Sequence, residues 1–199
     1  MAFNIRDFKA RGLVYGGARP SLFEVLLTLP TALQVDQVSQ QKFSFACRAA
    51  QLPASSLDSI DVPYFGRKIK IAGDRTFADW TVTIINDEDF GVRSMMEQWS
   101  NALNRLESNI RQPDLTIENY KTDIDILQYG KDGSIIRAYQ LIGAFPTAVD
   151  SIDLDWDTTN TVETFTTTFA YDYWLPTVET SDKKAGGVNV YGPDAQSDG

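Results

Sequence analysis

The sequence predicts a mainly β domain, an antiparallel β-sandwich or barrel with one flanking α-helix. Three observations lead to this fold class. Most apolar segments are short and alternate with period two, one segment alone has helical spacing, and the strand–helix–strand alternation of parallel sheets is absent. Aromatic residues make up 12% of the chain, which favours strands and subunit contacts. The 199 residues suffice for one such domain and are few for two.

The chain divides into three parts. Residues 1–20 form a polar, glycine-containing arm, residues 21–175 form the β-sandwich domain, and residues 176–199, rich in Gly, Asp and Ser, form a flexible tail. The arm lacks the apolar stretch of a signal peptide, and no apolar run approaches the ~20 residues that span a bilayer. We therefore expect a soluble protein, made in a cytoplasm, with no membrane partner.

The first half of the domain contains five expected strands, at residues 22–29, 43–47, 59–63, 68–72 and 80–85. Pro30 closes the first, and a polar connection of residues 31–42 leads to the second, whose apolar and polar residues alternate strictly. Phe65-Gly66 supplies the turn between the third and fourth strands, and Gly73-Asp74 predicts a second turn.

One amphipathic helix is expected next. Its apolar residues recur at helical spacing and lie on a single face: Val92, Met95, Met96, Trp99, Leu103 and Leu106. The preceding residues 86–89 (Asn-Asp-Glu-Asp) provide a capping side chain and carboxylates for the positive end of the helix dipole.

Strands resume after the helix, at residues 123–129, 134–142, 149–156 and 162–174. Residues 131–133 (Lys-Asp-Gly) predict a hairpin turn between the first two. In the last strand one face has the aromatic residues Phe165, Phe169, Tyr171 and Tyr173, which pack inward. The other face has Thr164, Thr166 and Thr168 and is polar but uncharged. In the strand at 149–156 the alternation places Asp153, Asp155 and Asp157 on one solvated face.

The composition argues against catalysis and against a cofactor or metal. There is no histidine, which removes the usual general base at neutral pH and the commonest metal ligand. The single cysteine, Cys47, lies in an apolar segment and is expected to be a buried, inert thiol. The cluster of aspartates from Asp153 onward does not fit a calcium loop, because its sixth and twelfth positions are Thr158 and Thr164. A carboxylate-dependent hydrolase remains a minor alternative.

The formal net charge is −9, and Lys and Arg do not gather into a basic run. High affinity for nucleic acid needs such a run to contact phosphates, so we expect no specific nucleic-acid binding.

Three stretches go beyond general β patterning. They are residues 18–23 (ARPSLF), residues 67–83 (RKIKIAGDRTFADWTVT) continuing into Asn-Asp-Glu at 86–88, and the closing motifs LDWD at 154–157, ETF at 163–165 and DYW at 172–174. In order and composition they resemble the tail tube protein of contractile-tailed bacteriophages, a family related to type VI secretion tube proteins. The resemblance covers roughly residues 18–174.

The resemblance implies a virion protein that assembles into stacked hexameric rings. The strands of neighbouring subunits would form one barrel around a channel, through which DNA passes during ejection without specific binding. The implied partners are other copies of the chain and the sheath, baseplate and tail terminator proteins. Two features depart from the family pattern, the long connection at 31–42 and the tail at 176–199.

The resemblance also suggests which residues meet between subunits. The segment matching the family's inter-ring excursion is residues 52–77, and the candidate interface residues in and beside it are Arg67, Lys68, Lys70, Asp74, Arg75 and Asp79. A solvated charged turn is the alternative for each of them. Candidates for the channel wall are the two polar faces described above, and either face alternatively points outward: Asp153, Asp155 and Asp157, or Thr164, Thr166 and Thr168.

A second function remains open at this point. A monomeric carbohydrate- or protein-binding β-sandwich would use exposed aromatic side chains, such as those of Phe165, Phe169 and Tyr171, as its binding face. Their burial or exposure therefore discriminates between the two functions.

Overall fold

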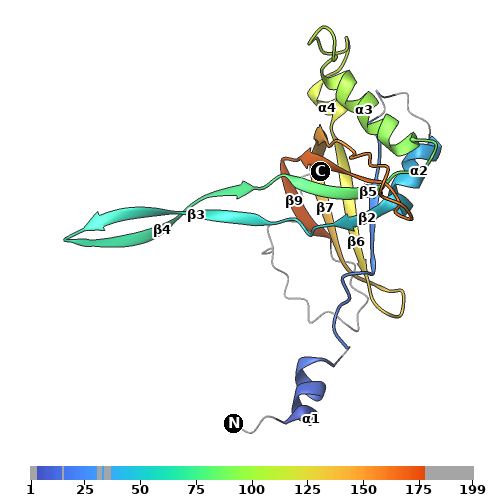
Figure 1. Cartoon of the computed structure of the whole chain (residues 1–199). Helices are drawn as coiled ribbons and strands as arrows, with labels where there is room; N and C mark the ends of the chain where they lie inside the picture. Colours follow the sequence, from blue (N-terminus) through green and yellow to red (C-terminus); the bar gives the residue numbers. More distant parts are fainter. Residues whose placement is uncertain (1–3, 15, 31–32, 34–36, 178–199) are drawn as a thin grey trace, which may run out of the picture.

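The computed structural model describes residues 4–14, 16–30, 33 and 37–177, and it confirms a mainly β, antiparallel fold. Figure 1 shows a β-sandwich from which two segments project, a long hairpin on one side and the N-terminal arm below. The arm contains two short helices, α1 (Ile5–Asp7) and the π-helix η1 (Phe8–Gly12).

Within the described residues, seven strands form one continuous sheet in the order β1-β6-β7-β8-β5-β2, with β9 also paired to β7. Every neighbouring pair is antiparallel. The strands are β1 (Phe23–Leu27), β2 (Cys47–Ala50), β5 (Trp80–Ile85), β6 (Thr122–Tyr129), β7 (Ile135–Val149), β8 (Thr164–Ala170) and β9 (Tyr173–Thr177).

Strand β7 joins the two layers of the sandwich. Its first part pairs with β6 and β9, and its last part pairs with β8. Gly143 lies between these parts with φ +68°, a conformation that glycine adopts without strain. The expected strand at 134–142 is therefore longer, and the one expected at 162–174 is divided into β8 and β9.

The core lies between the two layers, and helix α3 (Gly91–Leu103) contributes to it. The expected inward face of this helix is confirmed for Val92, Met95, Met96 and Trp99, whose side chains are buried. Leu106 lies beyond the helix and is 88% exposed, so its inclusion was wrong. Trp99 packs against the ring of Phe169, and its indole N–H donates to the carbonyl of Tyr120 at the end of the short helix α4 (Ile117–Tyr120), at 3.1 Å.

Helix α2 (Gln37–Ala46) corrects the strand expected at 43–47 and part of the polar connection at 31–42. Phe43 is fully buried, and Ala46 and Cys47 pack against the core, whereas Phe45 is 86% exposed. The packed positions are thus i, i+3 and i+4, as on a helix. Over the five residues 43–47, helical spacing cannot be distinguished from the alternation of a strand, because Phe43 and Cys47 fit both patterns.

A loop of residues 150–163 replaces the strand expected at 149–156, since β7 ends at Val149. Ile152 packs against the core, but Leu154 and Trp156 are 85% and 100% exposed, so the apolar alternation does not continue as the inner face of a strand. The Asp155 carboxylate instead accepts hydrogen bonds from the Asp157 N–H at 3.0 Å and the Thr158 hydroxyl at 3.1 Å. Such local bonds let aspartate stabilise a turn in place of a strand.

Candidate assembly surfaces

The projecting hairpin consists of β3 (Ser55–Tyr64) and β4 (Arg67–Phe77), which among the described strands pair only with each other. A ten-residue strand spans about 33 Å, so the hairpin tip lies far from the body of the domain (Figure 1). The expected turn at Phe65-Gly66 is confirmed, with both residues at positive φ. The turn expected at Gly73-Asp74 is wrong, because both residues lie within β4 opposite a register shift in β3.

The hairpin has one apolar and one charged face. On the apolar face Ile60 lies opposite Ile71, and Val62 lies opposite Ile69. These four side chains are 39–56% exposed, although their chemistry favours burial. On the other face Asp61 forms an ion pair with Lys68 at 3.3 Å. A two-stranded ribbon is at best marginally stable alone in water, and no described segment of the chain covers its apolar face.

The structure brings most of the predicted interface residues onto this one element. Five lie along β4, and Asp79 lies in the short link to β5; all six are exposed. Arg75 donates to the Ser55 hydroxyl at 3.0 Å, which ties the two strands near the base of the hairpin. The complete set is Arg67, Lys68, Lys70, Asp74, Arg75 and Asp79.

A second flat surface is the outer face of β5 and β8. Thr164, Thr166 and Thr168 lie on it, half-buried, while the alternate residues of β8 point into the core. Thr166 pairs with Thr83 and Thr168 with Thr81 of the neighbouring strand. The expected uncharged face of β8 is therefore present, and β5 extends it.

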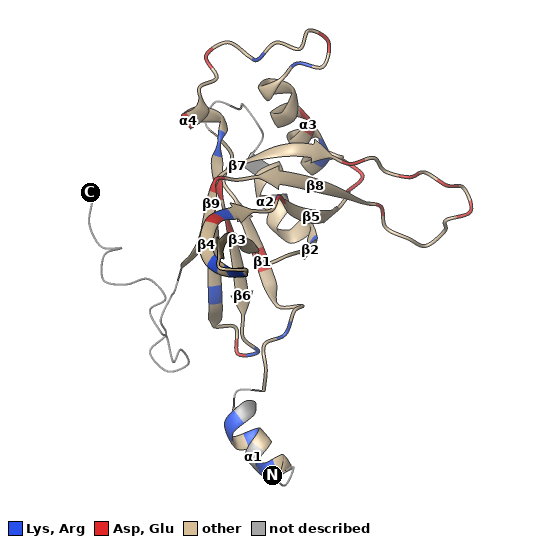
Figure 2. Ribbon diagram, turned by 90° about the vertical axis from the view of Figure 1, so that its left-hand side faces the viewer, with Lys and Arg blue, Asp and Glu red and all other residues tan. Residues whose placement is uncertain are grey.

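The acidic candidates lie elsewhere. Asp153, Asp155 and Asp157 are exposed residues of the loop at 150–163, which projects between β7 and β8 in Figure 2. They share no strand face, and the structure does not group them with the threonines. Leu154 and Trp156 in the same loop are 85% and 100% exposed.

The aromatic face that a glycan-binding module would need is absent from β8. Phe165 and Phe169 are 2% and 0% exposed and belong to the core. Tyr171 is partly buried against the same core. The most exposed rings lie far apart, those of Phe65 and Trp156 on two projecting segments and that of Phe45 on α2.

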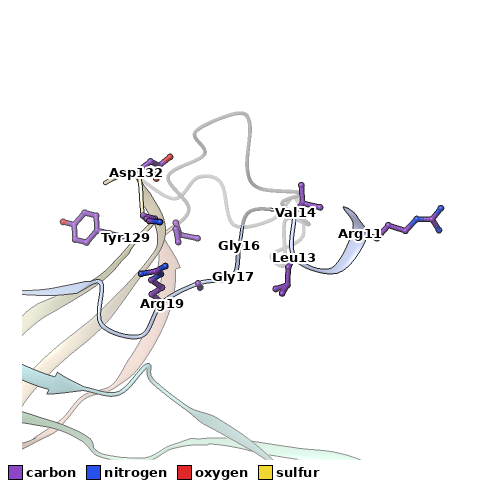
Figure 3. A pocket seen from close by; sticks show the side chains of 12 residues that line it. Arg11, Leu13, Val14, Gly16, Gly17, Arg19, Tyr129 and Asp132 are labelled. Carbon is purple, nitrogen blue, oxygen red and sulfur yellow. The ribbon is translucent and has the colours of Figure 1, made fainter. Parts of the chain in front are cut away.

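A cavity of about 700 Å³ lies between the N-terminal arm and the β6–β7 turn. Figure 3 shows Leu13, Val14 and Arg11 on the side of the arm, with Tyr129 and Asp132 across from them. Arg19 and Lys131 also line it, so its lining is more basic than acidic. No sequence pattern predicted this cavity, because it depends on how the arm lies against the domain.

The chemistry of the described residues offers little for catalysis. Burial raises the pKa of the Cys47 thiol to about 12, so this thiol stays protonated at neutral pH. No three potential ligand side chains among His, Cys, Asp and Glu gather closely enough in the described part of the chain to hold a metal ion. Across the same residues, no helix combines the length and apolar character needed to cross a bilayer.

Comparisons with known proteins agree on one family. The phage tail tube protein family matches residues 18–177. The tail tube protein gp19 of Enterobacteria phage T4 is 36% identical over 160 residues, which cover 79% of this chain and 90% of that protein. A tail tube protein of Serratia phage KSP90 is 28% identical over 119 residues, covering 60% and 66%.

Solved structures show the same fold at low sequence identity. A chain of the anti-feeding prophage baseplate superposes with a TM-score of 0.59 at 16% identity, covering 81% of this chain and 95% of that one. A chain of the sheath–tube complex of an extracellular contractile injection system gives 0.54 at 16% identity, covering 88% and 99%. The family match spans the whole sandwich and the hairpin, and this chain therefore belongs to the phage tail tube protein family.

Proposed function

We propose that this chain is the structural subunit of a phage tail tube, in which copies close into hexameric rings and the rings stack around a channel. The observation on which this depends most is the exposed apolar face of the β3–β4 hairpin, which no described part of its own chain covers. The ends of the sheet add to it, since β1 and β2 terminate the sheet order and each pairs with a single strand among those described. A neighbouring copy can satisfy both features.

Electron microscopy of the purified chain in negative stain tests this directly. Rings with a central hole, or tubes built from them, are the expected particles. Featureless monomers at high concentration would contradict the proposal, and monomers that bind glycans would support the alternative of a binding module.

The threonine face of β5 and β8 is our candidate for the channel wall. Its residues Thr164, Thr166 and Thr168 are small and uncharged, so they form no ion pair with passing phosphates. The loop with Asp153 and Asp155 then lies elsewhere on the tube, where its exposed Trp156 is available to a partner. DNA would pass through such a channel without specific binding.

The further partners follow from the family. One similar solved tube forms a complex with a sheath, and others come from a baseplate and from a sheath/tube terminator. We propose the corresponding sheath, baseplate and terminator proteins as partners of this chain in the virion.

We also infer that the chain is no enzyme. It has no histidine for proton transfer, and its one thiol has a raised pKa. Its work is therefore mechanical, and depends on contacts between copies.

A further inference from the structure

The tip of the β3–β4 hairpin has an unusual residue at its turn. Both turn residues have positive φ, +43° at Phe65 and +78° at Gly66, a geometry that normally selects Asn, Asp or Gly. Phe65 is nevertheless a phenylalanine, and it is 92% exposed. Its ring meets that of Tyr64 edge to face, with centroids 4.7 Å apart. A phenylalanine with a strained backbone and a solvated ring is an outlier from which a functional hypothesis for the tip can start.

An apolar cavity lies beside α2. Figure 1 shows this helix on the side of the domain opposite the hairpin. The cavity has a volume of about 500 Å³. Its apolar lining residues, which we name the α2 cup, are Phe45, Ala46, Ile85, Val92 and Val162. Phe45 and Val162 are 86% and 63% exposed, so the cup is open and no described part of the chain covers it.

We propose that the aromatic tip of one copy, Tyr64 and Phe65, inserts into the α2 cup of the next copy. This rests on the proposed function and specifies which two surfaces meet. A hairpin that leaves one side of the domain cannot reach a cup on the other side of the same chain (Figure 1). The contact is therefore head-to-tail, which allows it to repeat through a whole assembly.

The charges around the two surfaces favour this pairing. Arg67, Lys68 and Lys70 follow the tip along β4. The cavity that contains the cup is also lined by Lys42, Asn86 and Asp87. Lys42 forms ion pairs with Asp87, at 3.2 Å, and with Asp89, and Glu163 accepts from the Asn86 side chain at 2.7 Å, so three carboxylates surround one lysine here. Opposite charges at the rim steer partners together and suppress wrong pairings.

The distribution of charge also disfavours the cavity beside the N-terminal arm as the site for the hairpin tip. The space beside the N-terminal arm is lined by Arg11, Arg19 and Lys131, which would repel the basic strand behind the tip (Figure 3). Compared with the arm cavity, the cavity at the α2 cup combines apolar side chains with an excess of carboxylates.

Disulfide crosslinking tests the contact in the full chain. Phe65→Cys and Val162→Cys are introduced together with Cys47→Ala, and assembled protein is oxidised. A head-to-tail contact must give a ladder of dimers, trimers and longer species. A mixture of the two single-cysteine chains must give dimers only, and neither chain alone should crosslink. Pairing Phe65→Cys with Ile136→Cys, in the arm cavity, is the matched control and should give no product.

Microscopy of the same samples separates the two levels of the proposal. Tubes that form without a ladder overturn the tip-in-cup contact and leave the tube function standing. Samples with neither rings nor tubes, from the unmodified chain as well, overturn the tube function itself. A ladder from the arm-cavity control in place of the cup pair would also overturn the contact.

A second variant removes the ring without harming the turn. Asn suits the left-handed conformation at position 65, so Phe65→Asn should melt at the same temperature as the parent or higher. If the ring anchors the next copy, the concentration needed for assembly should rise about tenfold or more, as for a buried aromatic hot spot. Phe65→Tyr should retain assembly. Unchanged assembly of Phe65→Asn would overturn the proposal.

Discussion

Gly143 shows how one residue determines the path of the longest strand. It lies where β7 passes between the two layers, and its N–H donates to the Asp123 carboxylate at 3.0 Å. A Cβ at this position would collide with the carboxylate of Asp172, which forms an ion pair with Lys121 at 2.7 Å. The backbone conformation therefore favours glycine at this corner, and an added Cβ would also displace the Asp172 carboxylate from its ion pair.

Gly143→Ala should accordingly lower the free energy of unfolding by about 2–3 kcal/mol, since it combines a left-handed conformation with a steric clash. Gly133→Ala is the matched control, because Gly133 has φ +79° but nothing within 4 Å of an added Cβ. Gly133→Ala should lower the free energy of unfolding by only about 1 kcal/mol, the cost of the left-handed conformation. Chemical denaturation of both variants measures the difference; equal losses would show that the Asp172 contact is unimportant.

Tyr129 links β6 to β1 through a hydrogen bond from its hydroxyl to the Glu24 carboxylate, at 2.6 Å. That bond, with burial, raises the pKa of Tyr129 from 10.0 to about 12. A raised phenol pKa means that the stabilisation is complete below pH 10 and is lost as the pH rises toward 12.

Tyr129→Phe should therefore be less stable than the parent at pH 7–9, because Glu24 loses its donor. Its stability should also fall less than that of the parent between about pH 10 and pH 12. Thermal melts across this range provide the measurement. If the two proteins lose equal stability between about pH 10 and pH 12, groups other than Tyr129 cause the alkaline loss of stability.

At the scale of the element, the β3–β4 hairpin separates folding from assembly. Its apolar face is exposed in a single copy, so a charge placed there disturbs no core. Ile69→Asp should leave the thermal melt nearly unchanged and abolish tubes, because the charge would be buried unpaired at a subunit contact. Ala72→Asp, on the opposite face of the same strand, should still assemble. Sedimentation of both variants measures their assembly. If Ile69→Asp and Ala72→Asp assemble equally well, the apolar face is not a contact surface.

The charged residues of β4 lead to a separate expectation. Asp74→Ala or Arg75→Ala should weaken assembly more than folding, since both side chains are exposed in the single copy. An exposed pair contributes little to stability, whereas one buried at an interface needs its partner. Melting temperatures compared with sedimentation test this, and normal tubes from both variants would refute it.

Elements were predictable from the sequence wherever local chemistry is decisive. The strand at 80–85 and the turn at Phe65-Gly66 follow from β-branched residues and turn glycine, and the inward face of α3 follows from its spacing. Helix α2 was not predictable, because its last turn is too short to distinguish period two from 3.6. The loop at 150–163 had the alternation of a strand but no partner strand to pair with.

For the whole molecule, labelling of cysteine variants can test whether the threonine face of β5 and β8 lines the channel. Thr166→Cys, in a Cys47→Ala background, should react with a small thiol reagent and with a bulky one in single copies. In tubes the small reagent should still reach it and the bulky one should not, because only small molecules enter a narrow channel. Asp155→Cys, on the projecting loop, should react with both. If the bulky reagent labels position 166 in tubes at the single-copy rate, the threonine face lies outside.

Composition, period and motif order are enough to predict the fold class and the family, and the composition shows that the chain has no histidine. The surfaces that a single copy leaves exposed could be identified only from the arrangement of the strands in space. Whether Ile69, Phe65 or Phe45 lies in a core or in solvent depends on which distant segments pack against it. Local patterns contain no information on such long-range contacts, so the hairpin face and the α2 cup emerged only once the strands were placed in space.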